Sequence, residues 1–140
     1  MNMNARLEFG SDFLEISDFV HFPEDARGGN PYNSLFDICV KSGDFSGLAP
    51  CEYDIKKLRN FTAELEDMYD QKRECVDMKD FKYKSEIFVK MHKTGRITVS
   101  GNIYGGLFGE HSLTFEFEAD QTALPPFITG LKEMLREYDR

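Results

Sequence analysis

The sequence predicts an α+β fold, with a curved, mainly antiparallel sheet and two helices packed on one face of it. Two observations predict this class. Segments in which apolar and polar residues alternate, as on half-buried strands, twice give way to segments with apolar residues every three or four positions, as on amphipathic helices. Short turns join many of the alternating segments, and hairpin-linked strands pair antiparallel. The predicted order is strands, helix, strands, helix.

The N-terminal quarter of the chain predicts strands around one loop. Residues 6–20 are expected to form one or two strands, because Leu14 and Ile16 alternate with polar neighbours. Residues 23–32 combine several turn-forming residues without any periodicity and therefore predict a surface loop. A stronger strand pattern follows over residues 34–41.

A hairpin turn is predicted at Ser42-Gly43-Asp44, with a short returning strand over residues 45–49. The first helix is then predicted over residues 52–72, with Asp54 placed to cap its N-terminus. Its apolar stripe consists of Ile55, Leu58, Phe61, Leu65, Met68 and Tyr69. Three more strands are predicted over residues 75–79, 86–92 and 96–104.

The sharpest junction lies between residues 111 and 138. Leu113, Phe115 and Phe117 alternate with polar residues, which predicts a strand with one buried face. After Asp120-Gln121-Thr122 the spacing becomes helical, and the two apolar faces are expected to cover each other or to share one core. The helical stripe consists of Leu124, Phe127, Ile128, Leu131, Met134, Leu135 and Tyr138.

Composition limits the class of protein. The 140 residues fit a single domain, residues 1–140, which is large enough to bury about 68% of its unfolded surface. Residues 1–6 lack the apolar core of a signal peptide, and no apolar run could span a membrane. We therefore expect a cytoplasmic protein without a membrane partner. The net charge of −8 disfavours nucleic acid as a partner, and the three cysteines are expected to be reduced thiols.

Catalytic and metal-binding patterns are not found in the sequence. Cysteines and histidines do not occur at chelating spacings, and there is no glycine-flanked serine elbow. The three histidines, His21, His92 and His111, fall on different predicted elements. The sequence therefore predicts a protein without catalytic residues, metal or cofactor.

Carboxylates are the strongest candidates for binding a partner. Residues 8–25 contain acidic side chains and neither lysine nor arginine, which would suit a basic protein surface. Glu116 and Glu118 share one strand face about 7 Å apart, although the outward face of an ordinary strand would look the same. Leu107 and Phe108, on a glycine-rich loop, either contact a partner or cap the core. The candidate partner-binding carboxylates are Asp12, Glu15, Asp18, Glu24, Asp25, Glu116 and Glu118.

The C-terminal junction carries a family resemblance. The run Leu-Thr-Phe-Glu-Phe-Glu-Ala-Asp-Gln-Thr-Ala-Leu-Pro-Pro-Phe over residues 113–127, with Leu131, Leu135 and Tyr138, resembles the WapI-type immunity protein family. Upstream, Phe45-Ser46-Gly47 is similar to a short segment of that family. The strand-like run over residues 95–101 resembles another. The resemblance covers roughly residues 34–138.

The resemblance implies a non-enzymatic antitoxin in the cytoplasm. Such a protein binds and occludes the C-terminal domain of a contact-delivered polymorphic toxin, often a nuclease. A nuclease presents a basic face to its substrate, so carboxylates on the antitoxin would steer and orient the complex. Three alternatives remain. The chain could be a module that binds a small ligand in the concavity of its sheet, or an orphan domain of unknown role. It could also be a divergent enzyme that uses His92 or His111 with a carboxylate.

Overall fold

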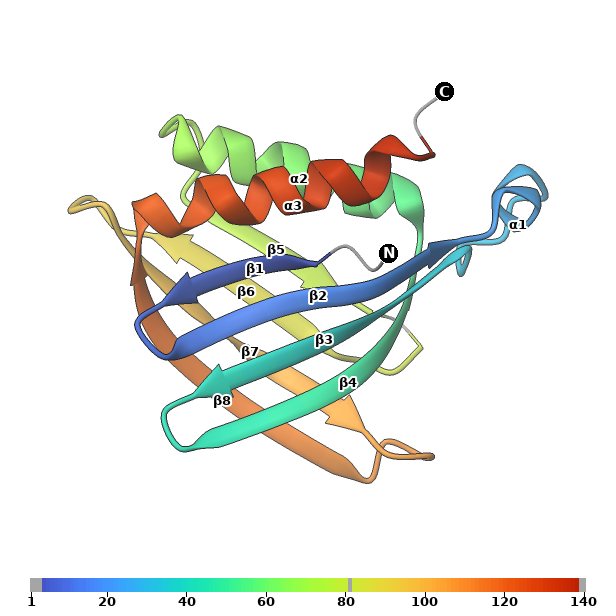
Figure 1. Ribbon diagram of the computed structural model, residues 1–140, viewed down its shortest axis with the longest axis horizontal. Helices are drawn as coiled ribbons and strands as arrows, with labels where there is room; N and C mark the ends of the chain where they lie inside the picture. The colour runs from blue at the N-terminus through green and yellow to red at the C-terminus, as the bar shows by residue number, and fades with distance from the viewer. Residues whose placement is uncertain (1–3, 81, 139–140) are drawn as a thin grey trace.

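The computed structural model describes residues 4–80 and 82–138 (Figure 1). Over these residues the strands form two four-stranded antiparallel sheets, and each strand pairs with its neighbours in chain order. The first sheet consists of β1 (Ala5–Phe9), β2 (Asp12–His21), β3 (Ser34–Ser42) and β4 (Phe45–Tyr53). The second consists of β5 (Cys75–Lys79), β6 (Glu86–Met91), β7 (Arg96–Gly105) and β8 (His111–Asp120).

Two long helices follow the two sheets in the chain. Helix α2 (Ile55–Tyr69) follows β4, and helix α3 (Leu124–Arg136) follows β8 through the short 3-10 helix η1 (Gln121–Ala123). The helices lie side by side at the top of Figure 1. Helix α2 packs against β5 and α3 packs against β1, so each helix covers the first strand of one sheet. The remaining helix, α1 (Pro23–Arg27), projects to one side.

The α+β class is confirmed, with antiparallel strands and two long helices on one side. The eight strands are divided between two sheets, where the sequence led us to expect a single curved one. A second difference is α1, which lies in the segment predicted as a loop. None of its residues is buried, so no apolar stripe marks it in the sequence. Residues 1–3, part of the predicted leaderless N-terminus, lie outside the described residues.

The predicted helix caps are present. The Asp54 carboxylate accepts the backbone N–H of Lys56 at 2.9 Å, at the start of α2. Asp120 accepts the N–H of Thr122 at 3.0 Å, where strand β8 turns into η1. Each cap satisfies a backbone donor that the helix itself leaves unpaired, and so fixes where the helix begins.

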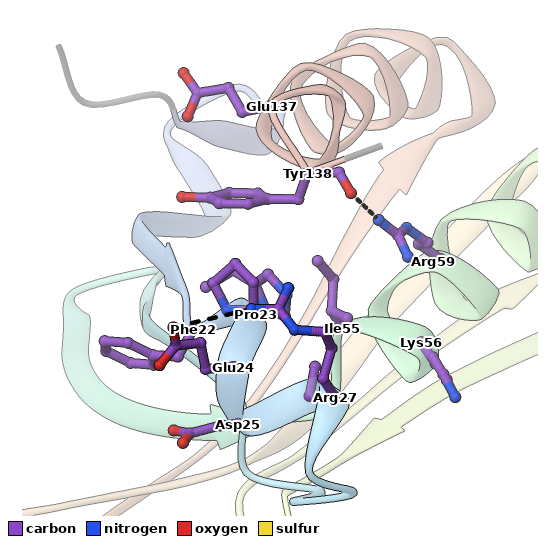
Figure 2. Close-up of a pocket in the computed structure, with 12 residues that line it drawn as sticks. Phe22, Pro23, Glu24, Asp25, Arg27, Ile55, Lys56, Arg59, Glu137 and Tyr138 are labelled. Carbon is purple, nitrogen blue, oxygen red and sulfur yellow. Dashed lines mark hydrogen bonds and ion pairs between the residues drawn. The ribbon is translucent and has the colours of Figure 1, made fainter. Parts of the chain in front are cut away.

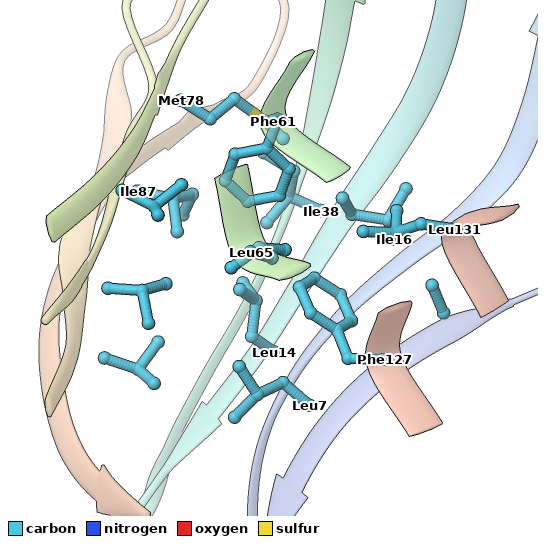
Figure 3. Close-up of a cluster of buried hydrophobic side chains, with 14 of the residues drawn as sticks. Leu7, Leu14, Ile16, Ile38, Phe61, Leu65, Met78, Ile87, Phe127 and Leu131 are labelled. Atoms are coloured by element: carbon cyan, nitrogen blue, oxygen red, sulfur yellow. The ribbon is translucent and has the colours of Figure 1, made fainter. Parts of the chain in front are cut away.

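The core lies between the two sheets and beneath the helices (Figure 3). Both helices insert aromatic rings there: Phe61 of α2 and Phe127 of α3 meet edge to face, with ring centroids 6.4 Å apart. Close approach of α3 to β1 depends on Gly130, because a Cβ at this position would lie 2.8 Å from Cα of Ala5. The other labelled core residues in Figure 3 are Leu7, Leu14, Ile16, Ile38, Leu65, Met78, Ile87 and Leu131.

At the end of the molecule opposite the helices, the two sheets contact each other directly through β4 and β7. Gly47 of β4 makes this possible, since a Cβ there would lie 3.1 Å from side-chain carbons of both Ile103 and Leu113. Gly105 of β7 likewise faces the backbone oxygen of Leu48. The hydroxyl of Ser42 also donates to a backbone oxygen of β8, at 3.1 Å.

Candidate interaction surfaces

The predicted partner-binding carboxylates lie on three parts of the structure. Asp12, Glu15 and Asp18 belong to β2, in the first sheet. Glu24 and Asp25 are exposed on α1. Glu116 and Glu118 are exposed on the outward face of β8, in the second sheet. The structure therefore does not gather them into one site.

Glu15 is already paired within the molecule. Its carboxylate lies 2.7 Å from Nε of Arg6 on the neighbouring strand, and Arg6 also contacts Glu8 at 3.2 Å. The guanidinium of Arg6 stacks over the ring of Phe13, 4.0 Å from its centroid. These contacts follow from register, because Arg6 and Glu15 are directly opposite on β1 and β2. Glu15 therefore offers less negative charge to a partner than its neighbours do.

Asp18 lies next to a second carboxylate that sequence reasoning missed, Asp37 of β3. An irregularity in the β2–β3 pairing between Ser17 and Val20 places Asp18 in a left-handed conformation, with φ of 55°. Burial raises the pKa of Asp37, and the adjacent Asp18 carboxylate raises it further. A like charge this close disfavours the ionised form of Asp37. The pairing of β2 with β3 brings Asp18 and Asp37 together, and their positions in the sequence do not reveal this.

The carboxylates of α1 line a cleft of about 950 Å³ (Figure 2). Glu24 and Asp25 lie on one wall, and Lys56 and Arg59 of α2 lie on the other. Arg59 donates from Nη2 to the backbone oxygen of Tyr138 at 2.8 Å, which ties the end of α3 to α2. The cleft is open and carries both signs of charge. The small-ligand alternative places its ligand in the concavity of the sheet. In the structure, core side chains fill the space between the sheets, and this cleft lies elsewhere.

A buried polar network anchors one edge of this cleft. His21 Nδ1 lies 2.9 Å from the Ser34 hydroxyl, which donates to Oδ1 of Asn33 at 3.0 Å. Asn33 also accepts the backbone N–H of Ile55 at 2.9 Å, at the start of α2. Burial lowers the pKa of His21, and the nearby positive charge of Arg59 adds to this effect. Its imidazole is therefore held neutral as a structural group.

The other two histidines lie on the surface. His92 Nε2 is 2.8 Å from the Thr98 hydroxyl, which donates to Glu118 at 3.0 Å. The histidine and the carboxylate are thus joined through a hydroxyl on the exposed outer face of the second sheet. This face is hollowed to about 730 Å³ beside Phe88. His111 is exposed at the start of β8.

Asp80, which sequence reasoning also missed, is a fully buried carboxylate. It accepts the backbone N–H of Lys82 at 2.9 Å. Burial raises its pKa, while backbone N–H groups, including that of Glu52 on β4, act in the opposite direction. The neighbouring Cys51 thiol is buried as well, and burial raises its pKa. This pair holds the segment after β5 against β4.

Leu107 and Phe108 contact solvent and do not cap the core. Their exposed fractions are 84% and 87%, on the loop between β7 and β8. Within residues 4–80 and 82–138, no three His, Cys, Asp or Glu side chains are grouped so that they could hold a metal ion. Nor is any helix in this part of the chain long and apolar enough to cross a membrane.

The structure thus defines an acidic α+β protein whose outer sheet faces and loops present carboxylates and apolar side chains. Comparison with known families identifies it further. Residues 12–139 match the family described as the immunity protein WapI-like family. The chain therefore belongs to the WapI-like immunity protein family, as the sequence resemblance suggested. No curated protein matches the chain.

Proposed function

We propose that this protein neutralises a toxin domain by binding to it and covering its active surface, without itself catalysing a reaction. Membership of the WapI-like immunity protein family over residues 12–139 carries this proposal. The proposed partner is the C-terminal domain of a contact-delivered polymorphic toxin. The proposed compartment is the cytoplasm, where such a toxin would act.

The charge of the chain supports a basic partner such as a nuclease. A net charge of −8 attracts cationic surfaces and raises the rate at which they meet. The carboxylates proposed to steer the toxin are those of β2, α1 and β8. Among them, Glu15 contributes least, because its ion pair with Arg6 at 2.7 Å is shorter than those of Glu24 with Arg27 and of Glu118 with Arg96, at 4.0 and 3.8 Å.

Co-expression tests the proposal directly. A candidate toxin C-terminal domain, taken from a gene next to that of this chain, is expressed in cells with and without the tagged protein. We expect the chain to restore growth and to co-purify with the toxin domain in a stable complex. Growth arrest that persists at full expression of the chain, with no co-purification, would show that the proposed function is wrong.

Salt dependence tests the electrostatic part separately. The association rate of the purified pair is measured by stopped flow at increasing salt concentration. Screening weakens attraction between exposed charges, so the rate should fall steeply as salt is added. A rate indifferent to salt would leave an immunity role standing and would refute steering by carboxylates.

A further inference from the structure

Exposed apolar side chains are concentrated at the end of the molecule opposite the two long helices. Among the large apolar residues that the structure describes, the four most exposed are Phe45, Leu48, Leu107 and Phe108, with exposed fractions of 70%, 62%, 84% and 87%. The next, Val20, is 44% exposed. We call these four residues the apolar end. Solvent-exposed apolar side chains grouped in this way mark interaction sites.

Contacts between the sheets place the start of the β7–β8 loop against β4 at Leu48. Phe45 and Leu48 belong to β4, whereas Leu107 and Phe108 belong to the β7–β8 loop. Gly105, just before this loop, would place a Cβ 3.0 Å from the backbone oxygen of Leu48. In Figure 1 the β3–β4 turn lies at the lower left and the β7–β8 loop at the lower right, with β4 between them and the two long helices at the top.

The β7–β8 loop has a defined conformation. Gly106 and Gly109 have positive φ, of 91° and 69°, which other residues rarely adopt. The Glu110 carboxylate folds back and accepts the backbone N–H of Phe108 at 2.8 Å. Such backbone hydrogen bonds lower the pKa of Glu110, so it stays ionised in this role. The loop therefore keeps Leu107 and Phe108 exposed in one conformation. A preordered loop loses less conformational entropy when a partner binds.

Carboxylates lie at the β3–β4 turn of the apolar end, and Glu110 lies on its β7–β8 loop. Asp12 accepts the backbone N–H of Gly43 at 2.8 Å, and Asp44 is the next residue in the same turn. The backbone oxygen of Glu116 accepts the hydroxyl of Ser42, so this residue lies beside the turn as well. Of the carboxylates predicted from sequence, Asp12 thus lies beside the turn that precedes Phe45, whereas the side chain of Glu116 lines the hollow beside Phe88 on the outer face of the second sheet. Apolar anchors inside a charged rim are the usual anatomy of a protein interface.

We propose that the apolar end is the surface through which this chain docks on its toxin. The partner surface that fits is a folded protein with an apolar pocket rimmed by lysine and arginine. This inference rests on the proposed immunity function and adds where the contact is made. Phe108, with Leu107 beside it, would be the anchor, because aromatic side chains are enriched in interfaces and a few buried residues carry most of the binding energy.

The test uses the toxin domain that co-purifies with the wild-type chain. In one variant Leu107→Ser and Phe108→Ser are combined, and the matched control is Tyr69→Ser at the end of α2, where the tyrosine is 43% exposed. Binding is measured by calorimetry after circular dichroism has shown that each variant is folded. We expect the double variant to raise Kd roughly tenfold or more and the control to change it by less than about twofold.

Hydrogen exchange provides a readout that does not depend on a variant. Binding of the toxin should slow exchange in residues 105–111 and in the β3–β4 turn more than in α2. Protection confined to α1 and the cleft of Figure 2 would overturn the docking proposal.

Failure of this proposal can be told apart from failure of the proposed function. A double variant that binds the toxin as tightly as wild type refutes the docking site and leaves the immunity role intact. A wild-type chain that neither binds nor protects refutes both. A second copy of the chain could also occupy the apolar end, and light scattering of the wild-type chain alone tests this by measuring its oligomeric state. A dimer that the double variant abolishes would assign the apolar end to a second copy of the chain, and the toxin would then dock elsewhere.

Discussion

At the end of the molecule that carries α2 and α3, apolar side chains from both sheets and both helices are buried together. At the opposite end, the sheets meet through Gly47 and Gly105, and large apolar side chains face water. The first arrangement removes apolar surface from solvent and stabilises the fold. The second leaves that surface uncovered, so its apolar residues contribute little to folding. The contrast separates what holds this protein together from what is available to a partner.

Truncation of the ring that α3 inserts into the core should have the largest effect. Phe127 is fully buried and packs edge to face on Phe61. We expect Phe127→Ala to reduce the free energy of unfolding by about 3–5 kcal/mol, through lost burial and the cavity left behind. Urea denaturation followed by circular dichroism measures this. A loss below about 1 kcal/mol would mean that the helices are not the stabilising end.

A smaller change in the free energy of unfolding is expected for Gly130→Ala, and its sign tells whether α3 contacts β1 closely. Alanine in the middle of a helix is normally favoured over glycine by about 1 kcal/mol. Here the new Cβ would lie 2.8 Å from the Ala5 backbone, so α3 must move away from β1. We expect Gly130→Ala to destabilise the protein by about 1–3 kcal/mol. The neighbouring exposed Thr129→Ala serves as the control, and a stabilised Gly130→Ala protein would contradict the tight α3–β1 contact.

His21 should make the helix-covered end sensitive to acid. Burial lowers the pKa of this histidine in the folded protein, whereas the unfolded chain takes up its proton near pH 6.5. The unfolded state therefore binds more protons as the pH falls below about 6.5, and stability decreases in that direction. We expect His21→Gln to flatten this part of the curve of unfolding free energy against pH. His111→Gln, at an exposed position, is the control, and equal slopes in wild type and His21→Gln would show that His21 does not contribute.

The smallest effect on stability is expected at the apolar end. Leu107→Ser with Phe108→Ser removes two side chains that are already in water. We expect the free energy of unfolding to change by no more than about 0.5 kcal/mol. A loss comparable to that of Phe127→Ala would erase the distinction between the two ends. It would also mean that these residues support the fold.

Periodic patterns predicted the parts of the fold that depend on local sequence. The apolar stripe of α3 is buried from Leu124 to Leu135, and both aspartate caps are in place. Division of the strands into two sheets was not predictable in this way. Nothing in the alternation of β4 or β5 shows that they do not pair with each other, because the choice depends on how α2 passes between them.

The exposure of the candidate interaction residues was likewise not predictable from local sequence patterns. Exposure of Leu107 and Phe108 was an open question in the sequence, since a loop can fold over a core or away from it. Phe45 was noted only within a segment that resembles the family, and its exposure was not predicted. It has the same parity as the buried residues Ala49 and Cys51, so alternation alone would bury it. It is exposed because β4 extends beyond the packed core at this end.

The contact between Gly130 and Ala5 also bears on how the protein is made. The ribosome completes β1 before any other described strand and α3 after all of them, so the outer edge of β1 stays uncovered during most of translation. An uncovered strand edge is a template for pairing with other chains. Chains released before α3 would therefore aggregate or be degraded. The amount of folded protein would then depend on how many chains are finished.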